Sequence, residues 1–181
     1  MKTFIISCLT ADGYIGKHST HAAMWTSKED KKRFVELSKR ARVVIMGQNT
    51  WKTLGGRPLK DRLNIVYSPE RLADMPETVE IISKTPAELL KELENRGFTE
   101  AAICGGSMIY TMFMKSGMVN KLYLTIEPIV FGNGVRLFKE EMDFKLKLVN
   151  SIQTENGALL LEYEVISKGD LSLRFERFVY D

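Results

Sequence analysis

The sequence predicts that a buried strand passes into a helix at Val44-Ile45-Met46-Gly47-Gln48-Asn49-Thr50-Trp51. A second junction of this kind is Ile103-Cys104-Gly105-Gly106-Ser107. Small or polar residues open each helix, where free N–H groups and the positive end of the dipole favour an anion. Either junction alone is equally explained by a tight turn. Two of them at the carboxyl ends of parallel strands predict a crevice sized for a dinucleotide.

The rest of the chain repeats the alternation of short apolar runs with amphipathic segments. This pattern predicts an α/β fold of three layers, with a mainly parallel central sheet and helices on both faces. We expect parallel strands at residues 3–9, 42–46, 63–67, 79–82, 101–104 and 121–126. We expect helices at residues 27–40, 87–95 and 107–115, and a short one that opens at Asn49.

After Thr125 the pattern changes to alternating apolar and polar residues, at 144–152 and 158–166. The connection contains Asn156-Gly157, a strong turn signal, so these segments predict an antiparallel pair that completes the sheet. Residues 1–166 are therefore expected to form one catalytic domain. Residues 167–181 form an extension whose alternation predicts either an extra strand or a subunit contact.

Composition agrees with a single cytoplasmic domain. A chain of 181 residues with 44% apolar residues can bury a sizeable core without a metal or a disulfide. Cys8 and Cys104 lie in apolar runs, and reduced, buried thiols are typical of the cytoplasm. The first apolar run is too short for a signal peptide, and no stretch has the length of a membrane span. We expect no membrane partner.

The charged and imidazole side chains suggest neither a nucleic-acid site nor a metal site. The net charge is only +3, and Lys31-Lys32-Arg33 is expected to lie on a solvated helix face. His18 and His21 are three residues apart without a third ligand nearby, so we expect them to be solvated loop residues.

Asp30 is the strongest candidate for a catalytic side chain. It precedes Phe34 by four residues, which places it on the apolar side of the predicted helix. Partial burial would raise its pKa, as general acids and binding carboxylates often require. The alternative is that Ser27-x-x-Asp30 is a capping box. Thr26-x-x-Glu29 is the better box, and it would leave Asp30 free.

The ordinary G-x-G-x-x-G fingerprint is absent, so another nucleotide-binding fold is implied. Five motifs occur in order: Trp25…Asp30…Phe34, Met46-Gly47-x-x-Thr50-Trp51, Gly56-Arg57-Pro58-Leu59…Arg62-x-Asn64-Ile65, Gly105-Gly106-x-x-x-Tyr110 and Leu122-Tyr123-Leu124-Thr125. Together they resemble dihydrofolate reductase over most of residues 1–166. The resemblance implies that fold, with reduction of 7,8-dihydrofolate to tetrahydrofolate by hydride transfer from NADPH.

The resemblance also implies roles for individual residues at the substrate. Asp30 would bind the pterin amino and ring N–H groups, Thr125 would reach the same carboxylate, and Trp25 would help hold an ordered water. These three are the catalytic candidates. The residues expected at the substrate are Cys8, Phe34, Leu54 and Arg62, with Phe34 and Leu54 around the rings and Arg62 on the glutamate carboxylate.

On the cofactor side, Ala11-Asp12-Gly13-Tyr14-Ile15-Gly16 resembles the start of a mobile loop over nicotinamide, although a plain Asp-Gly turn is the alternative. Backbone near Cys8 and Ile15 would reach the carboxamide, and the Gly105–Gly106 bond is cis in that family. The resemblance implies cofactor contacts from Ile15, Gly16, Gly47, Asn49, Thr50, Ser68, Lys84, Gly105, Gly106, Ser107 and Tyr110. Gln48 replaces an arginine that grips the 2′-phosphate, and Lys84 or Arg71 would compensate.

One segment departs from this pattern. Residues 128–138 are similar to the reductase domain of riboflavin biosynthesis, which shares the fold and reduces a ribosylaminopyrimidine phosphate. The Trp25…Asp30 spacing and the Gly-Arg-Pro-Leu segment favour folate, and no zinc deaminase half is attached. A nucleotide-binding relative without turnover is a third hypothesis. Monomer and homodimer are both compatible with the sequence.

Overall fold

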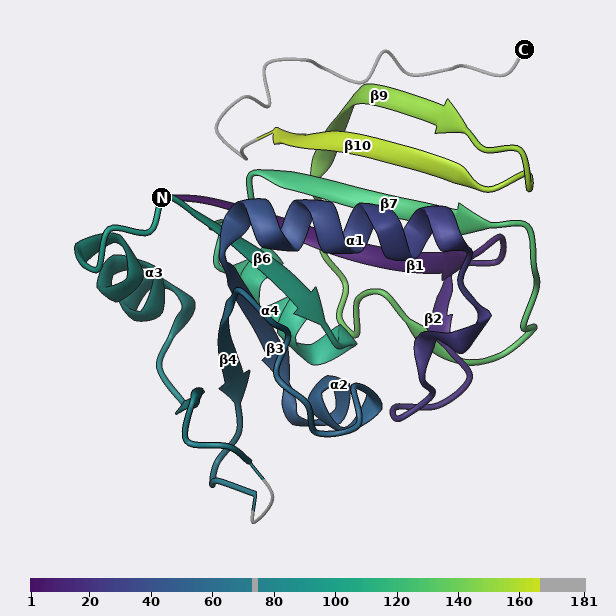
Figure 1. Ribbon diagram of the computed structural model, residues 1–181. Coiled ribbons are helices and arrows are strands. Elements are labelled where there is room, and N and C mark those ends of the chain that lie inside the picture. Colours follow the sequence, from purple (N-terminus) through teal and green to yellow (C-terminus); the bar gives the residue numbers. More distant parts are fainter. Residues whose placement is uncertain (73–74, 167–181) are drawn as a thin grey trace.

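A computed structural model describes residues 1–72 and 75–166 of the chain, and the layers that it shows are those expected. Eight strands form the central sheet in the order β5-β4-β3-β6-β1-β7-β10-β9 (Figure 1). Their bounds are β1 Lys2–Thr10, β3 Val43–Gly47, β4 Leu63–Tyr67, β5 Val79–Ile82, β6 Glu100–Gly105, β7 Lys121–Glu127, β9 Lys145–Gln153 and β10 Leu159–Ile166. The strands from β5 to β7 are parallel, while β10 pairs antiparallel with both β7 and β9.

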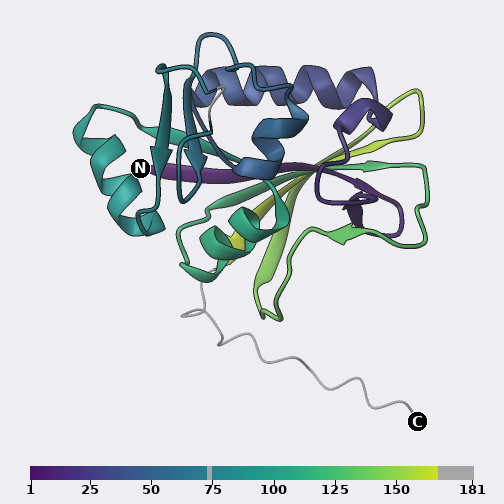
Figure 2. The same cartoon turned by 90° about the horizontal axis from the view of Figure 1, so that it is seen from below.

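Within the described residues, four α-helices cover the two faces of the parallel part of this sheet. They are α1 Lys28–Ala41, α2 Gln48–Thr53, α3 Pro86–Asn95 and α4 Ser107–Lys115. Alternate strand residues point to opposite faces, so Val44 and Met46 pack with Trp51 of α2, and Ile45 packs with Phe113 of α4. Figure 2 shows α1 and α2 on one side of the sheet and α3 and α4 on the other. The parallel strands β1, β3, β4, β6 and β7 are therefore largely buried on both faces, as a parallel sheet requires.

Helix α3 is capped within its own first turn, whereas the N-cap predicted for α1 is wrong. Thr85 and Glu88 form a complete capping box at the start of α3, with Pro86 as the first helical residue. In α1 the N-cap is Ser27, whose Oγ accepts the Asp30 N–H at 3.2 Å. The Thr26 hydroxyl donates instead to a carbonyl of the preceding 3₁₀ turn, Ala23–Trp25, so the Thr26 box does not form.

A small two-stranded sheet was not predicted. It pairs β2, Tyr14–Gly16, with β8, Val135–Arg136. The carboxylate of Asp12 fixes the neighbouring turn, because it accepts the N–H groups of Phe131 and Gly132, the latter at 2.7 Å. Two segments more than 110 residues apart in sequence are thereby held side by side at one end of the sheet.

The C-terminal hairpin forms as expected, with Gly157 at φ 84 in the connection between β9 and β10. Residues 167–181, for which an extra strand or a subunit contact was predicted, lie outside the described residues. Within the described part of the chain, no helix is both long and apolar enough to cross a membrane.

Candidate active site

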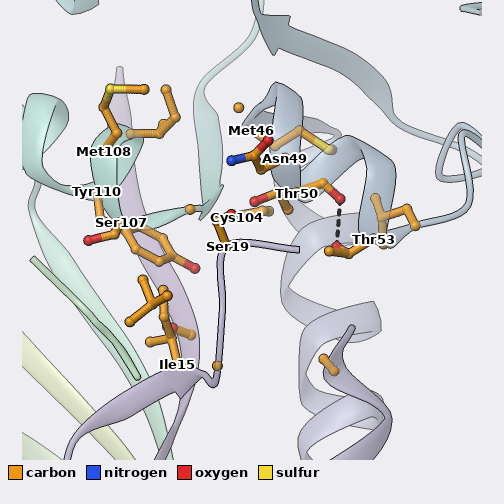
Figure 3. A pocket seen from close by; sticks show the side chains of 18 of the residues that line it. Ile15, Ser19, Met46, Asn49, Thr50, Thr53, Cys104, Ser107, Met108 and Tyr110 are labelled. Carbon is orange, nitrogen blue, oxygen red and sulfur yellow. Dashed lines mark hydrogen bonds between the residues drawn. The ribbon is translucent and has the colours of Figure 1, made fainter. Parts of the chain in front are cut away.

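A cavity of about 880 Å³ lies where β1, β3 and β6 end. Parallel strands bring their carboxyl ends to one edge of the sheet, which is where ligands bind in folds of this type. The walls come from α1, α2 and α4 and from the loop after β2. In Figure 3, Ser107 and Tyr110 of α4 face Asn49 and Thr50 of α2 across this space, with Ile15 below.

The α1 side of the cavity collects the residues predicted for substrate. Its lining includes Cys8, Phe34, Leu54 and Arg62, together with the catalytic candidates Trp25 and Asp30. Thr125, the third catalytic candidate, is almost fully buried behind them at 1% exposure. The structure therefore brings this predicted set together around one end of the cavity.

Asp30 sits in an environment that favours its protonated form. Burial is the main cause of its raised pKa, and the charge of Glu127 adds to the effect. A hydrogen bond from the Thr125 hydroxyl lowers this pKa, as do the nearby Thr26 hydroxyl and the charge of Arg33. A half-buried carboxyl with a raised pKa in a cleft is typical of a functional group.

Arg62 is held by its neighbours at the edge of the cavity. Its Nε donates to the carbonyl of Lys60 at 2.9 Å, and its Nη1 donates to Ser38 Oγ at 2.7 Å. These bonds fix the plane of the guanidinium, a group suited to forked recognition of a carboxylate.

The opposite end of the cavity contains two helix starts without side-chain caps. Gly47 is the N-cap of α2 and Gly106 is the N-cap of α4, and neither provides a side-chain hydrogen bond. The first N–H groups of both helices therefore remain for a ligand. The Gly105–Gly106 peptide bond is cis, as the resemblance implied.

Close packing explains why glycine occurs at two of these positions. A Cβ on Gly105 would lie 2.9 Å from the Tyr110 hydroxyl oxygen, and its φ of 109° also disfavours other residues. A Cβ on Gly47 would lie 3.0 Å from Cγ1 of Ile109. Tyr110 is fixed in turn, since its hydroxyl donates to the Ile6 carbonyl at 2.8 Å.

Three polar atoms of the cavity wall lack a hydrogen-bond partner among the described residues although they are buried. They are Nε1 of Trp25, the hydroxyl of Tyr67 and Oγ of Ser107. Buried polar groups are normally satisfied, so their presence in one cavity indicates that a polar ligand or water completes them.

The two cations proposed to compensate for Gln48 do not reach the cavity. Lys84 forms an ion pair with Glu92 and is not part of the lining. Arg71 donates to backbone carbonyls of Met75, Pro76 and Val79. Ser68 does line the cavity, as expected, and its hydroxyl donates to the carbonyl of Glu70 at 2.6 Å.

Sequence reasoning missed Glu127 and misplaced Arg33. Glu127 is only 4% exposed, and its Oε1 accepts the Ser27 N–H at 2.8 Å. Its position on the strand, two residues after Thr125, was the available signal, because i and i+2 share a face. Arg33 was expected on the solvated face, but its guanidinium donates to the carbonyls of Leu124 and Leu161.

The two cysteines are poor nucleophiles, and the two histidines lie at the mouth of the cavity. Burial raises the pKa of Cys104 to about 12 and raises that of Cys8 even further. Neither thiol is thus a nucleophile near neutral pH. His18 and His21 line the cavity mouth, and no cluster suited to a metal occurs among residues 1–72 and 75–166.

Comparisons with known proteins agree with this geometry. The family model described as dihydrofolate reductase matches residues 2–152. Dihydrofolate reductase of Gallus gallus is 32% identical over 143 residues, which cover 71% of this chain and 74% of that protein.

Two solved structures share the fold. Dihydrofolate reductase from Enterococcus faecalis, complexed with NADP(H) and RAB-propyl, has a TM-score of 0.68 at 23% identity, covering 91% of this chain and 94% of that one. The diaminohydroxyphosphoribosylaminopyrimidine deaminase/5-amino-6-(5-phosphoribosylamino)uracil reductase from Thermotoga maritima has a TM-score of 0.73 at 17% identity, covering 91% of this chain and 56% of that one. Both likenesses concern the fold alone.

Proposed function

Since this chain belongs to the dihydrofolate reductase family, we propose that its cavity binds dihydrofolate against α1 and NADPH across the starts of α2 and α4. The protein is an NADPH-dependent oxidoreductase that reduces 7,8-dihydrofolate to tetrahydrofolate. The observation that carries the assignment of the two ends is the pairing of a half-buried acid at one end with uncapped helix starts at the other.

The residues present fit the cofactor. Uncapped N–H groups at Gly47 and Gly106 suit the pyrophosphate, and Asn49, Thr50 and Ser107 add polar side chains beside them. The unpartnered hydroxyl of Ser107 points to a polar occupant. NADPH supplies the hydride, and Ile15, Gly16 and Tyr110 line the part of the cavity where the nicotinamide would lie.

On the substrate side, Asp30 would accept two N–H groups of the pterin in a forked pair, which orients the ring against the cofactor site. Phe34 and Leu54 provide apolar surfaces for the rings, and Arg62 offers a fixed guanidinium to the carboxylate at the far end of the substrate. When it is ionised, the negative charge of Asp30 would also favour positive charge on the ring, which helps protonation at N5.

The first test is NADPH oxidation by the purified chain with dihydrofolate, beside Asp30→Asn. We expect turnover near neutral pH to fall at least about tenfold in the variant, because a positioned acid contributes this much or more. The turnover of substrate that is already protonated should fall less in the variant. Unchanged turnover in Asp30→Asn would remove Asp30 from the mechanism.

The same assay separates the alternatives. Oxidation with a ribosylaminopyrimidine phosphate but not with dihydrofolate would favour the riboflavin-type reductase that residues 128–138 resemble. Tight NADPH binding without NADPH oxidation in the presence of either substrate would indicate a binding protein.

We also infer that the protein acts in the cytoplasm, where the thiols of Cys8 and Cys104 stay reduced. Monomer and homodimer remain the two candidates for its assembly. Sedimentation of the full chain beside a chain that ends at residue 166 would distinguish them and show whether the last 15 residues form a subunit contact.

A further inference from the structure

The start of α1 is capped by a residue from another part of the fold. In a complete capping box, the third helical residue returns its carboxylate to the N–H of the N-cap residue. Helix α3 of this protein does so, because Thr85 N–H donates to Glu88 Oε2 at 2.9 Å. Helix α1 has the same spacing in Ser27 and Asp30, so Asp30 could be drawn into the same local bond.

Glu127 takes that place in α1. The Ser27 N–H donates to Glu127 Oε1 at 2.8 Å, although the two residues are 100 positions apart. Asp30 keeps only the other half of the box, in which its own N–H donates to Ser27 Oγ at 3.2 Å. Its carboxylate is therefore released from capping and faces the cavity.

Glu127 reaches this position from the inner face of β7. Thr125 and Glu127 lie two positions apart on the strand and share that face, where they are 1% and 4% exposed. Oε1 of Glu127 also accepts a long hydrogen bond of 3.8 Å from Cys8 Sγ on β1. A carboxylate is thus buried directly behind the pocket acid without lining the cavity itself.

We propose that Glu127 is a positioning residue for Asp30: it caps α1 in place of Asp30 and sets a second negative charge behind the catalytic carboxyl. This inference rests on the proposed function of Asp30 as the substrate-binding acid. It gives Glu127 two separable effects, one through a hydrogen bond and one through charge.

The charge effect has a definite sign. A neighbouring negative charge disfavours ionisation of a carboxyl group. After burial, which is the main cause, the charge of Glu127 therefore also raises the pKa of Asp30. The other titratable groups around Asp30 are Arg33 of α1, which lowers this pKa, and the neutral Cys8 thiol of β1 and Tyr110 phenol of α4. Removing the Glu127 charge should therefore lower the pKa of Asp30.

Two variants separate the effects. Glu127→Gln keeps an oxygen that can accept the Ser27 N–H but removes the charge, whereas Glu127→Met removes both at similar length. Glu100→Gln is the matched control, because Glu100 binds Arg40 near the other end of α1 at 2.8 Å. It changes the net charge equally without touching Ser27 or Asp30.

The first readout is direct titration of the Asp30 carboxyl carbon by NMR in the free protein, assigned by loss of the signal in Asp30→Asn. We expect Glu127→Gln to lower this pKa by at least about half a unit, and Glu100→Gln to leave it unchanged. An identical Asp30 titration in Glu127→Gln and wild type would overturn the charge effect. This readout needs no turnover, so it is independent of whether dihydrofolate is the substrate.

The second readout is the steady-state kinetics of dihydrofolate reduction. In Glu127→Gln we expect a nearly unchanged KM, with the pH dependence of kcat moved to lower pH together with the Asp30 pKa. In Glu127→Met the freed Ser27 N–H should draw Asp30 into the capping box and raise KM about tenfold or more. Equal KM values in the Met and Gln variants, both with normal NADPH binding as the check on folding, would overturn the capping effect.

Discussion

At the scale of single residues, the ionised form of Asp30 is proposed to support activity, but it lowers the stability of the free protein. Its pKa is raised above 3.8 in the folded protein, so the folded state holds its proton to higher pH than the unfolded chain. The free energy of unfolding consequently falls as pH rises from the unfolded toward the folded pKa. Ionising this acid destabilises the free protein.

Asp30→Asn imitates the protonated carboxyl and should therefore stabilise the free protein while it impairs turnover. Urea unfolding at several pH values is the measurement. The stability gain over wild type should be present at pH 8, shrink as pH falls through the raised folded pKa of Asp30, and be absent below its unfolded pKa. A gain of the same size at all pH values would mean that ionisation of Asp30 is not its cause.

Arg33 is a structural cation that joins α1 to the sheet. Its guanidinium donates to two backbone carbonyls, Leu124 on β7 and Leu161 on β10, and lies 5.3 Å from the centroid of the Tyr123 ring. Arg33→Met would leave these carbonyls unsatisfied, which costs about 1–3 kcal/mol. Chemical denaturation should detect this loss, and Lys32→Met, at the exposed neighbouring position, should change stability little.

The two cysteines should be inert in the folded protein. Because burial raises the pKa of both thiols, the thiolate needed for attack on a disulfide reagent is scarce at pH 8. We expect no thiol to react with Ellman's reagent in the native state and two to react after denaturation. Rapid native labelling at Cys8 would show that the cavity wall opens.

At the scale of elements, the spacing of α2 and α4 depends on Gly47. This residue has φ −91°, which any residue can adopt, so a substitution here is limited only by the space available for a side chain. Gly47→Ala places a Cβ 3.0 Å from Ile109 Cγ1 and should force the two helix starts apart. Overpacking of this kind destabilises by about 1–3 kcal/mol.

NADPH affinity should fall along with stability in Gly47→Ala, since the pyrophosphate is proposed to lie between these starts. Titration calorimetry would measure the NADPH affinity of Gly47→Ala and of the double variant that also carries Ile109→Ala. Ile109→Ala removes the clashing carbon, so adding it to Gly47→Ala should recover part of the affinity. No recovery would indicate that Gly47 acts in another way.

The elements differ in how far sequence could predict them. Strands β1, β3, β4 and β6 are short runs of Val, Ile and other apolar residues buried on both faces, which makes them recognisable without any partner. β2 and β8 have three and two residues, too few for any periodicity, and they form only because distant segments meet. Arg33 and Glu127 depend on contacts across about 100 residues, which helix or strand periodicity cannot reveal.

The cap of α1 shows the same limit at a single residue. Thr26 and Ser27 both precede a carboxylate by three positions, so local pattern alone ranks Thr26-Glu29 first. In the structure the N-cap is Ser27 instead, because Glu127 at the end of β7 accepts the Ser27 N–H and fixes where the helix begins. Most of the predicted site lines the cavity because it lies on strand ends and helix starts, whose positions the strand order determines.

At the scale of the whole molecule, one cavity is bordered by segments from almost the entire length of the chain, from Ile6 to Lys139. The loop with His18 and His21 touches Phe131, whose ring centroid is 5.7 Å from that of His21 and 5.1 Å from that of Trp25. Asp12 anchors the same segment through the backbone of Phe131 and Gly132. The cavity mouth is thus tied to β2 and to the connection after β7.

Asp12→Asn should loosen this mouth without reaching the cavity floor. Its carboxylate accepts two backbone N–H groups and the Thr10 hydroxyl, and these bonds lower the pKa of Asp12. Asparagine offers one acceptor oxygen in place of two. We expect faster amide hydrogen exchange at residues 129–134 and a higher KM for NADPH, with the fold retained by circular dichroism. Unchanged exchange in this segment would show that Asp12 does not hold it.

The unpartnered indole of Trp25 has a practical consequence. The chain contains only two tryptophans, Trp25 in the cavity wall and Trp51 on α2 beneath it. Reduced nicotinamide absorbs light in the region where indole emits, so a cofactor bound beside them should quench their fluorescence by energy transfer. The protein therefore contains its own optical reporter, and Trp51→Phe would leave Trp25 as the single emitter through which occupancy could be followed without a label.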